Sequence, residues 1–246
     1  MRVSSVKAAS IVALIIGGAS LAHATTTFNI VAPTAVVSNT GGNLNPTCCN
    51  VVDTINQNGL AAVGSQFTNG QNWANYFAGN PLHTWVALNP GGLTGADDYE
   101  WFSQTGLSSA AIVYDLGASL NLAGIALWNE DSTGVATLAV FSCGNDSTCA
   151  APTSLLAASA VTANSVGVDY LAQQFSWALS GGTRYVEIVV TPTVPLGSMA
   201  IGQVAFDSAT PEPSTWILMG FGLAAIGFWR SKSQRPVLES VKVVNR

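Results

Sequence analysis

The chain has two uncharged apolar segments, one near each end. The part that can fold as a water-exposed domain is therefore limited to residues 25–210. Arg2 and Lys7 precede the apolar run at residues 8–18. Ala22 and Ala24 then supply the small-x-small pattern that signal peptidase recognises. We therefore predict a signal peptide at residues 1–24 and export of the remaining chain.

The second apolar run covers residues 214–229 and is followed by a basic cluster at residues 230–235. A helix of this length spans about 24 Å, less than the roughly 30 Å hydrocarbon core of a bilayer, so length alone also allows a buried helix. The flanks favour a transmembrane helix, because Trp216 and Trp229 lie at its ends and the basic cluster is retained in the cytoplasm. We predict that residues 25–210 lie outside.

Pro211, Glu212 and Pro213 immediately precede this run. A Pro-Glu-Pro motif, a short apolar helix and a basic cluster in succession resemble the PEP-CTERM sorting signal over residues 211–235. The resemblance implies processing by an exosortase, an integral-membrane cysteine-type enzyme of Gram-negative bacteria that make exopolysaccharide and grow as biofilms. It also implies passage through the inner membrane to the cell surface or extracellular matrix. Residues 236–246 are predicted to form a short cytoplasmic tail.

The region between the two ends is acidic, with eleven acidic side chains, one basic side chain (Arg184) and a net charge of −10. Nucleic-acid binding requires a cationic surface to neutralise phosphates. We therefore expect no nucleic-acid partner.

Residues 25–210 predict one all-β domain. Short segments rich in Val, Ile, Tyr, Trp and Thr recur between clusters of turn-forming residues, as in an antiparallel sandwich. In residues 111–116, for example, Ile112, Tyr114 and Leu116 alternate and share one face. The eight predicted strands are residues 26–31, 84–88, 111–116, 122–128, 135–142, 171–177, 185–190 and 199–206. This pattern suits a single jelly-roll-like β-sandwich.

Five segments of this region, in order, resemble a discoidin-type, galactose-binding-like sandwich over residues 70–207. They are Thr84-Trp85 and residues 113–117, 122–128, 184–188 and 201–206. The resemblance implies a carbohydrate-associated module that holds a structural calcium ion. Residues 25–69 fall outside it and are predicted to add an edge strand and loops.

The cysteines predict at least one disulfide, because export takes the chain into an oxidising compartment. The turn-forming residues between Cys143 and Cys149 can bring the two sulfurs together, so we predict that this pair is bonded. The adjacent Cys48 and Cys49 could form a vicinal disulfide or bridge to another chain, and the sequence leaves both open. Zinc is disfavoured, because only one histidine remains after signal removal.

Catalysis receives little support from the sequence. His83 is that single histidine, and neither a Gly-x-Ser-x-Gly elbow nor a His-Glu-x-x-His pair is present. We interpret His83 as a structural or surface residue. Asp97, Asp98 and Glu100 could supply the two carboxylates that glycoside hydrolysis needs, but a solvated acidic loop explains them more simply.

The residue types predict two ligand sites, neither of which has a specific sequence motif. Asp97, Asp98 and Glu100 are the candidate calcium ligands, since calcium takes carboxylate and carbonyl oxygens from flexible loops, and plain surface charge is the alternative. Trp73 and Trp101 are the candidate sugar-stacking residues, and core packing is the alternative for both.

These observations together predict an exported cell-surface or matrix protein that acts as a non-catalytic adhesion or carbohydrate-associated module. Its expected partners are signal peptidase, an exosortase-type enzyme, the membrane and exopolysaccharide. Two alternatives are a secreted hydrolase that acts on extracellular polysaccharide and an envelope-stabilising protein without a small ligand.

Overall fold

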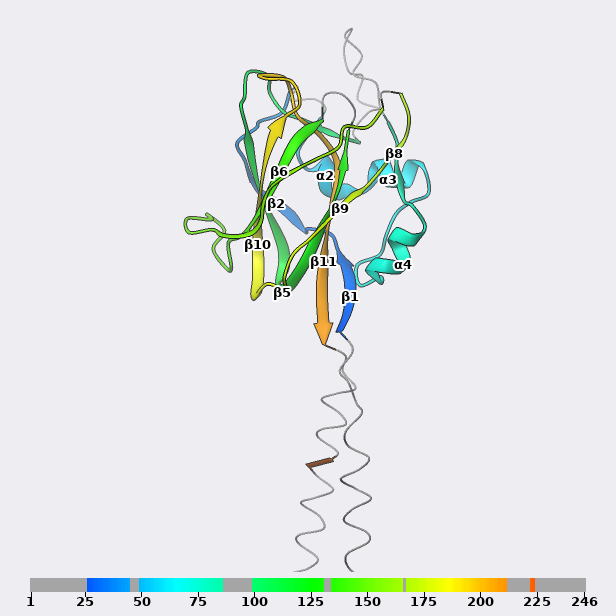
Figure 1. The fold of residues 1–246 in the computed structure, drawn as a ribbon, viewed down its shortest axis with the longest axis vertical. Coiled ribbons are helices and arrows are strands. Elements are labelled where there is room, and N and C mark those ends of the chain that lie inside the picture. Colours follow the sequence, from blue (N-terminus) through cyan, green and yellow to red (C-terminus); the bar gives the residue numbers. More distant parts are fainter. Residues whose placement is uncertain are drawn as a thin grey trace, which may run out of the picture. The chain divides into compact units, whose positions relative to one another are not determined.

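A computed structural model describes residues 26–44, 49–85, 99–130, 134–165, 167–211 and 222–223. Residues Thr27–Thr210 form one compact unit, whose described part is a β-sandwich with short helices on one flank (Figure 1). The predicted all-β sandwich is confirmed.

The strands account for most of the described chain. They are β1 (Thr26–Val31), β2 (Ala35–Asn39), β3 (Leu82–His83), β4 (Trp101–Phe102), β5 (Ala110–Asn129), β6 (Val135–Ser142), β7 (Thr153–Ala160), β8 (Tyr170–Leu171), β9 (Gln173–Ser176), β10 (Gly182–Pro192) and β11 (Ala200–Pro211). Strands β3 and β8 form a separate two-stranded ladder.

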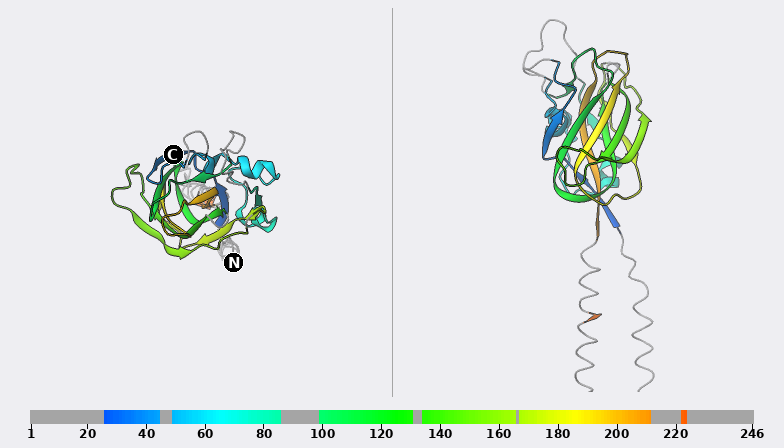
Figure 2. Two further views of the ribbon diagram at one scale, coloured as in Figure 1. Left: turned by 90° about the horizontal axis from the view of Figure 1, so that it is seen from above. Right: turned by 90° about the vertical axis from the view of Figure 1, so that its left-hand side faces the viewer.

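Strand β5 belongs to both layers of the sandwich. Its first half pairs with β2 and β10, in a layer that continues through β6 to β7. Its second half pairs with β11 and β9, and β1 lies on the other edge of β11. The chain bends between the halves near Gly117, whose φ of +78° suits glycine. Figure 2 shows the resulting wrap of the strands around one core.

The interior is filled by alternate side chains of the two layers. Ile112 and Tyr114 from the first half of β5 face Ile125 and Leu127 from the second half, and all four are fully buried. Because burial of each large apolar side chain contributes about 1.5–3 kcal/mol, this shared core joins the two layers into one unit. The predicted inward face of residues 111–116 is confirmed.

Three helical segments were not predicted from the sequence: α2 (Asp53–Asn56), α3 (Asn58–Ala62) and α4 (Trp73–Ala78). Asn72 caps the N-terminus of α4, and its side chain accepts a hydrogen bond from the Asn75 amide at 3.0 Å. Tyr76 and Phe77 of this helix pack against Trp128 of β5. The helices therefore cover a second, smaller apolar cluster.

Most predicted strands match the structure, and β6 has the predicted bounds. Segments 111–116 and 122–128 form one continuous strand, β5. The predicted strand 84–88 is wrong at residues 84–85, which follow the short strand β3, and its residues 86–88 lie outside the described residues. The predicted strand 171–177 is divided between β8 and β9. Strands β2, β3, β4 and β7 were not predicted.

Within the described part of the chain, no helix is long and apolar enough to cross a membrane. The predicted transmembrane helix at 214–229 lies outside the described residues apart from 222–223.

Candidate functional site

His83, Glu100 and Tyr170 form a buried polar cluster beside β11. His83 and Tyr170 are opposite each other in the β3–β8 ladder, with ring centroids 5.1 Å apart. The Tyr170 hydroxyl donates to Glu100 Oε1 at 2.6 Å, and His83 Nδ1 lies 3.8 Å from the same oxygen. All three side chains are at most 3% exposed. Among the described residues, Glu100 supplies the carboxylate that lies within 4 Å of His83.

Two glycines close the space around the His83 ring. A Cβ at Gly59 would overlap the ring, and a Cβ at Gly202 would lie 2.8 Å from its Cε1 atom. Side chains larger than hydrogen therefore cannot stand at these positions without displacing His83. Because Gly59 and Gly202 lie so close to the His83 ring, a substrate has no room to contact the ring.

The electrostatics of His83 agree with a structural role. Burial lowers the pKa of His83 from 6.5 to about 4, so the ring is neutral at pH 7. Its Nδ1 donates to the carbonyl oxygen of Thr84 at 2.9 Å, which fixes the proton on that nitrogen. A neutral, enclosed imidazole does not offer a base to a molecule in solution.

Of the predicted acidic cluster, Glu100 is the member that lies within the described residues. Glu100, expected in a solvated loop or at a calcium ion, is buried, and its Oε1 accepts the Tyr170 hydrogen bond. No group of three His, Cys, Asp or Glu side chains within the described residues could hold a metal ion. Asp97 and Asp98 lie outside the described residues, so the calcium site at Asp97, Asp98 and Glu100 stays a prediction.

The two candidate sugar-stacking tryptophans have different environments. Trp101 is fully buried in β4, and its Nε1 donates to the Gly42 carbonyl oxygen at 2.8 Å. It therefore has no exposed face for a sugar, which corrects the prediction that it binds ligand. Trp73 is partly buried on α4, with its ring 4.5 Å from that of Phe77, and its binding role stays a prediction.

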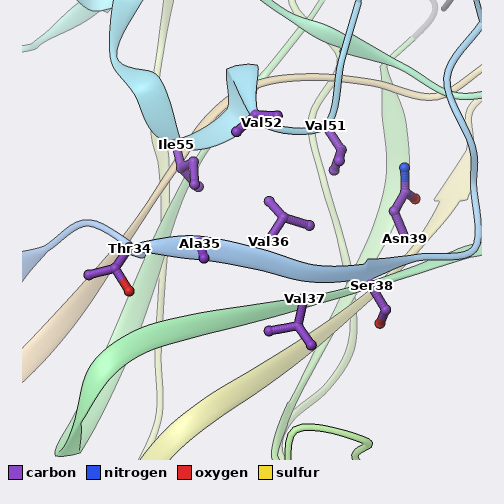
Figure 3. Close-up of a pocket in the computed structure, with 9 residues that line it drawn as sticks. All are labelled: Thr34, Ala35, Val36, Val37, Ser38, Asn39, Val51, Val52 and Ile55. Atoms are coloured by element: carbon purple, nitrogen blue, oxygen red, sulfur yellow. The ribbon is translucent and has the colours of Figure 1, made fainter.

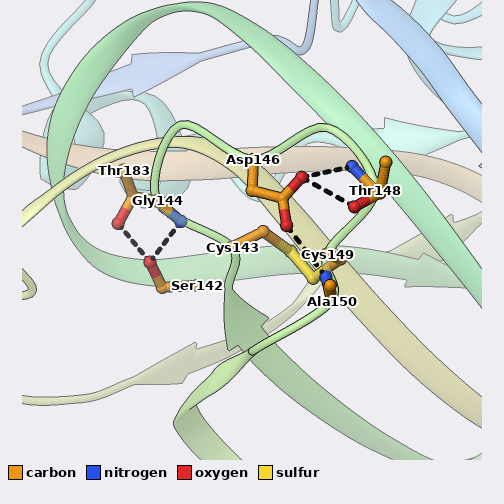
Figure 4. Close-up of a disulfide and its surroundings, with 8 residues drawn as sticks. All are labelled: Ser142, Cys143, Gly144, Asp146, Thr148, Cys149, Ala150 and Thr183. Atoms are coloured by element: carbon orange, nitrogen blue, oxygen red, sulfur yellow. Dashed lines mark hydrogen bonds between the residues drawn. A yellow bond between two sulfur atoms is a disulfide. The ribbon is translucent and has the colours of Figure 1, made fainter.

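The predicted disulfide between Cys143 and Cys149 is confirmed. It closes the turn after β6, where Asp146 accepts hydrogen bonds from the Thr148 amide, the Thr148 hydroxyl and the Ala150 amide (Figure 4). Cys49 also forms a disulfide, whereas Cys48 lies outside the described residues. The covalent link and the Asp146 contacts hold the loop in one shape.

An apolar groove of about 400 Å³ separates β2 from α2. Val36 points into it from β2, and Val52 and Ile55 face it from α2 (Figure 3). Strand β2 pairs with β5 in the described structure, with a register shift between Val36 and Ser38. Such a bulge discourages the addition of a further strand at an edge.

A second groove, here named the hydroxyl groove, has a volume of about 440 Å³. It lies between the β6–β7 hairpin and the segment that enters β10, and its walls carry hydroxyl side chains, small residues and two leucines. Its lining is Ser142, Thr153, Ser154, Leu155, Ala178, Leu179, Ser180, Gly181 and Gly182. No charged residue is among them, and the volume is within the usual range for small-molecule sites. Sequence reasoning missed this groove, because serine and glycine runs resemble ordinary turns.

The last strand of the sandwich leads directly into the Pro-Glu-Pro motif. Strand β11 ends at Pro211, the first residue of that motif. Residues 209–232 match the PEP-CTERM protein-sorting motif. The predicted sorting signal is thereby confirmed, and the PEP-CTERM motif indicates export and membrane-anchored sorting in Gram-negative bacteria. The other predicted processing residues, Ala22, Ala24, Glu212 and Pro213, lie outside the described residues.

Solved structures of similar fold accompany this PEP-CTERM match, whereas no curated protein matches the chain. The C-terminal domain of a chitobiase from Bacteroides fragilis is 12% identical with a TM-score of 0.47, over 73% of this chain and 97% of that one. The CBM32-1 and CBM32-2 domains of Clostridium perfringens ZmpB, solved with GalNAc, are 11% identical with a TM-score of 0.43, over 71% and 33%. Reduced XRCC1, solved with the DNA polymerase β catalytic domain, is 13% identical with a TM-score of 0.44, over 72% and 97%.

Proposed function

We propose that this protein is displayed at the cell surface or in the extracellular matrix as a non-catalytic adhesion or carbohydrate-associated module. The observation that carries the proposal is the position of the sorting motif, whose match covers residues 209–232 and therefore begins in the last residues of β11. A folded sandwich joined directly to a sorting signal is suited to delivery as a module. The enclosed His83 supports a non-catalytic role.

We further propose that the hydroxyl groove binds a neutral glycan. Thr153 and Ser154 are exposed there, and Leu179, 53% exposed, adds an apolar edge. Hydroxyl groups both donate and accept hydrogen bonds, as sugar hydroxyls require. Arg184, the single basic side chain of residues 25–210, is bound to Asp115, which disfavours anionic ligands.

The first experiment determines the intact mass of the protein recovered from the envelope and matrix of its own host. A species that begins at Thr25 and ends close to the PEP-CTERM motif supports export and processing. A species that still ends at Arg246 contradicts the sorting proposal, because the signal would then not have been removed.

The second experiment tests glycan binding on an array of neutral and anionic glycans with the folded sandwich. Ser154→Arg fills the hydroxyl groove and is expected to abolish binding of neutral glycans. The matched control is Ala158→Arg, an exposed position on the same strand outside the groove, which is expected to retain binding. A flat array with folded protein contradicts the glycan proposal and favours an envelope-stabilising role, and release of sugar product favours the hydrolase alternative.

A further inference from the structure

The end of β11 is held by side chains of β1. The hydroxyl oxygens of Thr27 and Thr210 lie 3.0 Å apart, and the Thr27 hydroxyl also donates to the Thr210 carbonyl oxygen at 3.3 Å. Asn29 Nδ2 donates to the Thr210 hydroxyl oxygen at 2.8 Å. The first strand after the predicted signal peptide therefore binds the residue that directly precedes the Pro-Glu-Pro motif.

Strand β1 is itself fixed to the sandwich. Ile30 is fully buried, its amide donates to the Gln71 carbonyl oxygen at 2.8 Å, and its own carbonyl oxygen accepts from the Gly70 amide at 2.9 Å. The Ala32 amide donates to the Asn69 side chain at 2.8 Å. The contacts to Thr210 therefore come from an anchored strand and not from a loose terminus.

The match to the sorting motif begins within the folded strand, at residue 209 of β11. Ala209 pairs with Asn121 on one side of β11, and Thr210 contacts β1 on the other. Enzymes that bind a chain in extended form need its main-chain groups free, as in strand addition to a sheet edge. A cut within β11 would therefore require local unfolding of a strand that is bound on both sides.

We propose that β1 acts as a clamp on the sorting motif, closing β11 to the processing enzyme and confining cleavage to the chain after Thr210. This inference rests on the proposed processing of the sorting signal. It predicts that the mature protein keeps all of the strand up to Thr210. The clamp thus sets where the mature chain ends.

Two variants in a host that processes the protein test the clamp, with the intact mass as the readout. Thr27→Ala/Asn29→Ala removes the side-chain contacts to Thr210 and should raise the fraction of product cut within β11 by about tenfold. Thr27→Cys/Thr210→Cys locks the two strands with a disulfide. The locked protein is expected to be processed at the wild-type site and to the wild-type extent, because the enzyme acts beyond the clamp.

Thr34→Ala is the matched control, because it removes a threonine hydroxyl bond to the Asp115 carbonyl oxygen, 3.0 Å long, away from the motif. Its product should end at the same residue as the wild-type product. A wild-type product that ends within β11, or a locked variant that accumulates unprocessed, overturns the clamp while leaving processing intact. If the wild-type protein is not processed at all, the sorting proposal fails and the clamp fails with it.

Discussion

The guanidinium of Arg184 binds both carboxylate oxygens of Asp115, with Nε donating to Oδ1 at 3.0 Å and Nη2 to Oδ2 at 2.9 Å. The pair joins β10 to β5 next to the register shift between Thr183 and Tyr185. The Arg184 side chain also lies over the ring of Tyr185, 5.1 Å from its centroid. The single basic side chain of residues 25–210 is thus held in an ion pair.

Substitution Asp115→Asn is expected to lower the melting temperature at pH 7 by only a few degrees, because the pair is partly exposed and solvent screens it. The Arg184 guanidinium lowers the pKa of Asp115 below its ordinary 3.8. The stabilisation is therefore present above pH 3.8 and is lost as the pH falls through the lower, folded value. Thermal melts from pH 7 to pH 2 should show the wild type and variant converging in acid. Arg184→Lys, which keeps the charge but not the two parallel bonds, should give an intermediate result.

Acidification is expected to have opposite effects at two buried groups. Burial lowers the pKa of His83 in the folded protein from 6.5 to about 4. As the pH falls from 6.5 to 4, the unfolded chain therefore binds a proton that the folded protein does not, and the free energy of unfolding decreases by about 3 kcal/mol. Burial raises the pKa of Asp207 from 3.8 to about 6, so that group adds stability as the pH falls from 6 to 3.8. In the described structure Asp207 Oδ1 has no hydrogen-bond partner, which is why its ionised form is disfavoured.

Single variants separate these effects in urea unfolding at several pH values. Asp207→Asn should be more stable than the wild type at pH 7 and should lose stability steeply between pH 6.5 and pH 4. His83→Gln should instead gain stability between pH 6 and pH 4. Identical pH profiles for the three proteins would contradict the assignment of both groups.

Substitution Gly59→Ala is expected to destabilise the fold by about 2 kcal/mol, because the new methyl group would overlap the His83 ring. Gly181→Ala is the control, since a Cβ there meets no atom within 4 Å, and its effect should stay within about 0.5 kcal/mol. Chemical denaturation measures both. Equal stability of the two variants would show that the ring has room to move.

Substitution of both Cys143 and Cys149 by serine is expected to cost about 2 kcal/mol, because the disulfide closes a loop of six residues' separation. Asp146→Ala in the serine variant should cost more than in the disulfide-bonded protein, since Asp146 then holds the loop alone. Unfolding of the four proteins without reductant gives this double-mutant cycle. Additive losses would show that the two constraints act independently.

The parts of the fold that the sequence predicts are those with an apolar alternation. Ile112, Tyr114 and Leu116 revealed an inward face, and that face is buried. Strand β7 gave no such signal, because its sequence TSLLAASA is rich in Ser and Ala, which have low strand preference. Its pairing with β6 makes it a strand.

The candidate site was less predictable, because its contacts join distant parts of the chain. The sequence places Glu100 in a run of acids typical of a surface loop, whereas in the structure it is buried and accepts a hydrogen bond from the Tyr170 hydroxyl, 70 residues away in the chain. The enclosure of His83 likewise depends on Gly59 and Gly202, which no local pattern connects. In contrast, the disulfide and the sorting motif are encoded in short, continuous segments, and both predictions hold.

The contact between Thr27 and Thr210 also means that the first and last residues of the sandwich lie side by side. A circular permutant in which a short linker joins these two residues, with new ends at the exposed residues 150–152, would keep every strand pairing described above. Folding of this permutant would show that the sandwich does not require the natural order of its strands. That order would instead follow from the need to place the export signal before the sandwich and the sorting signal after it.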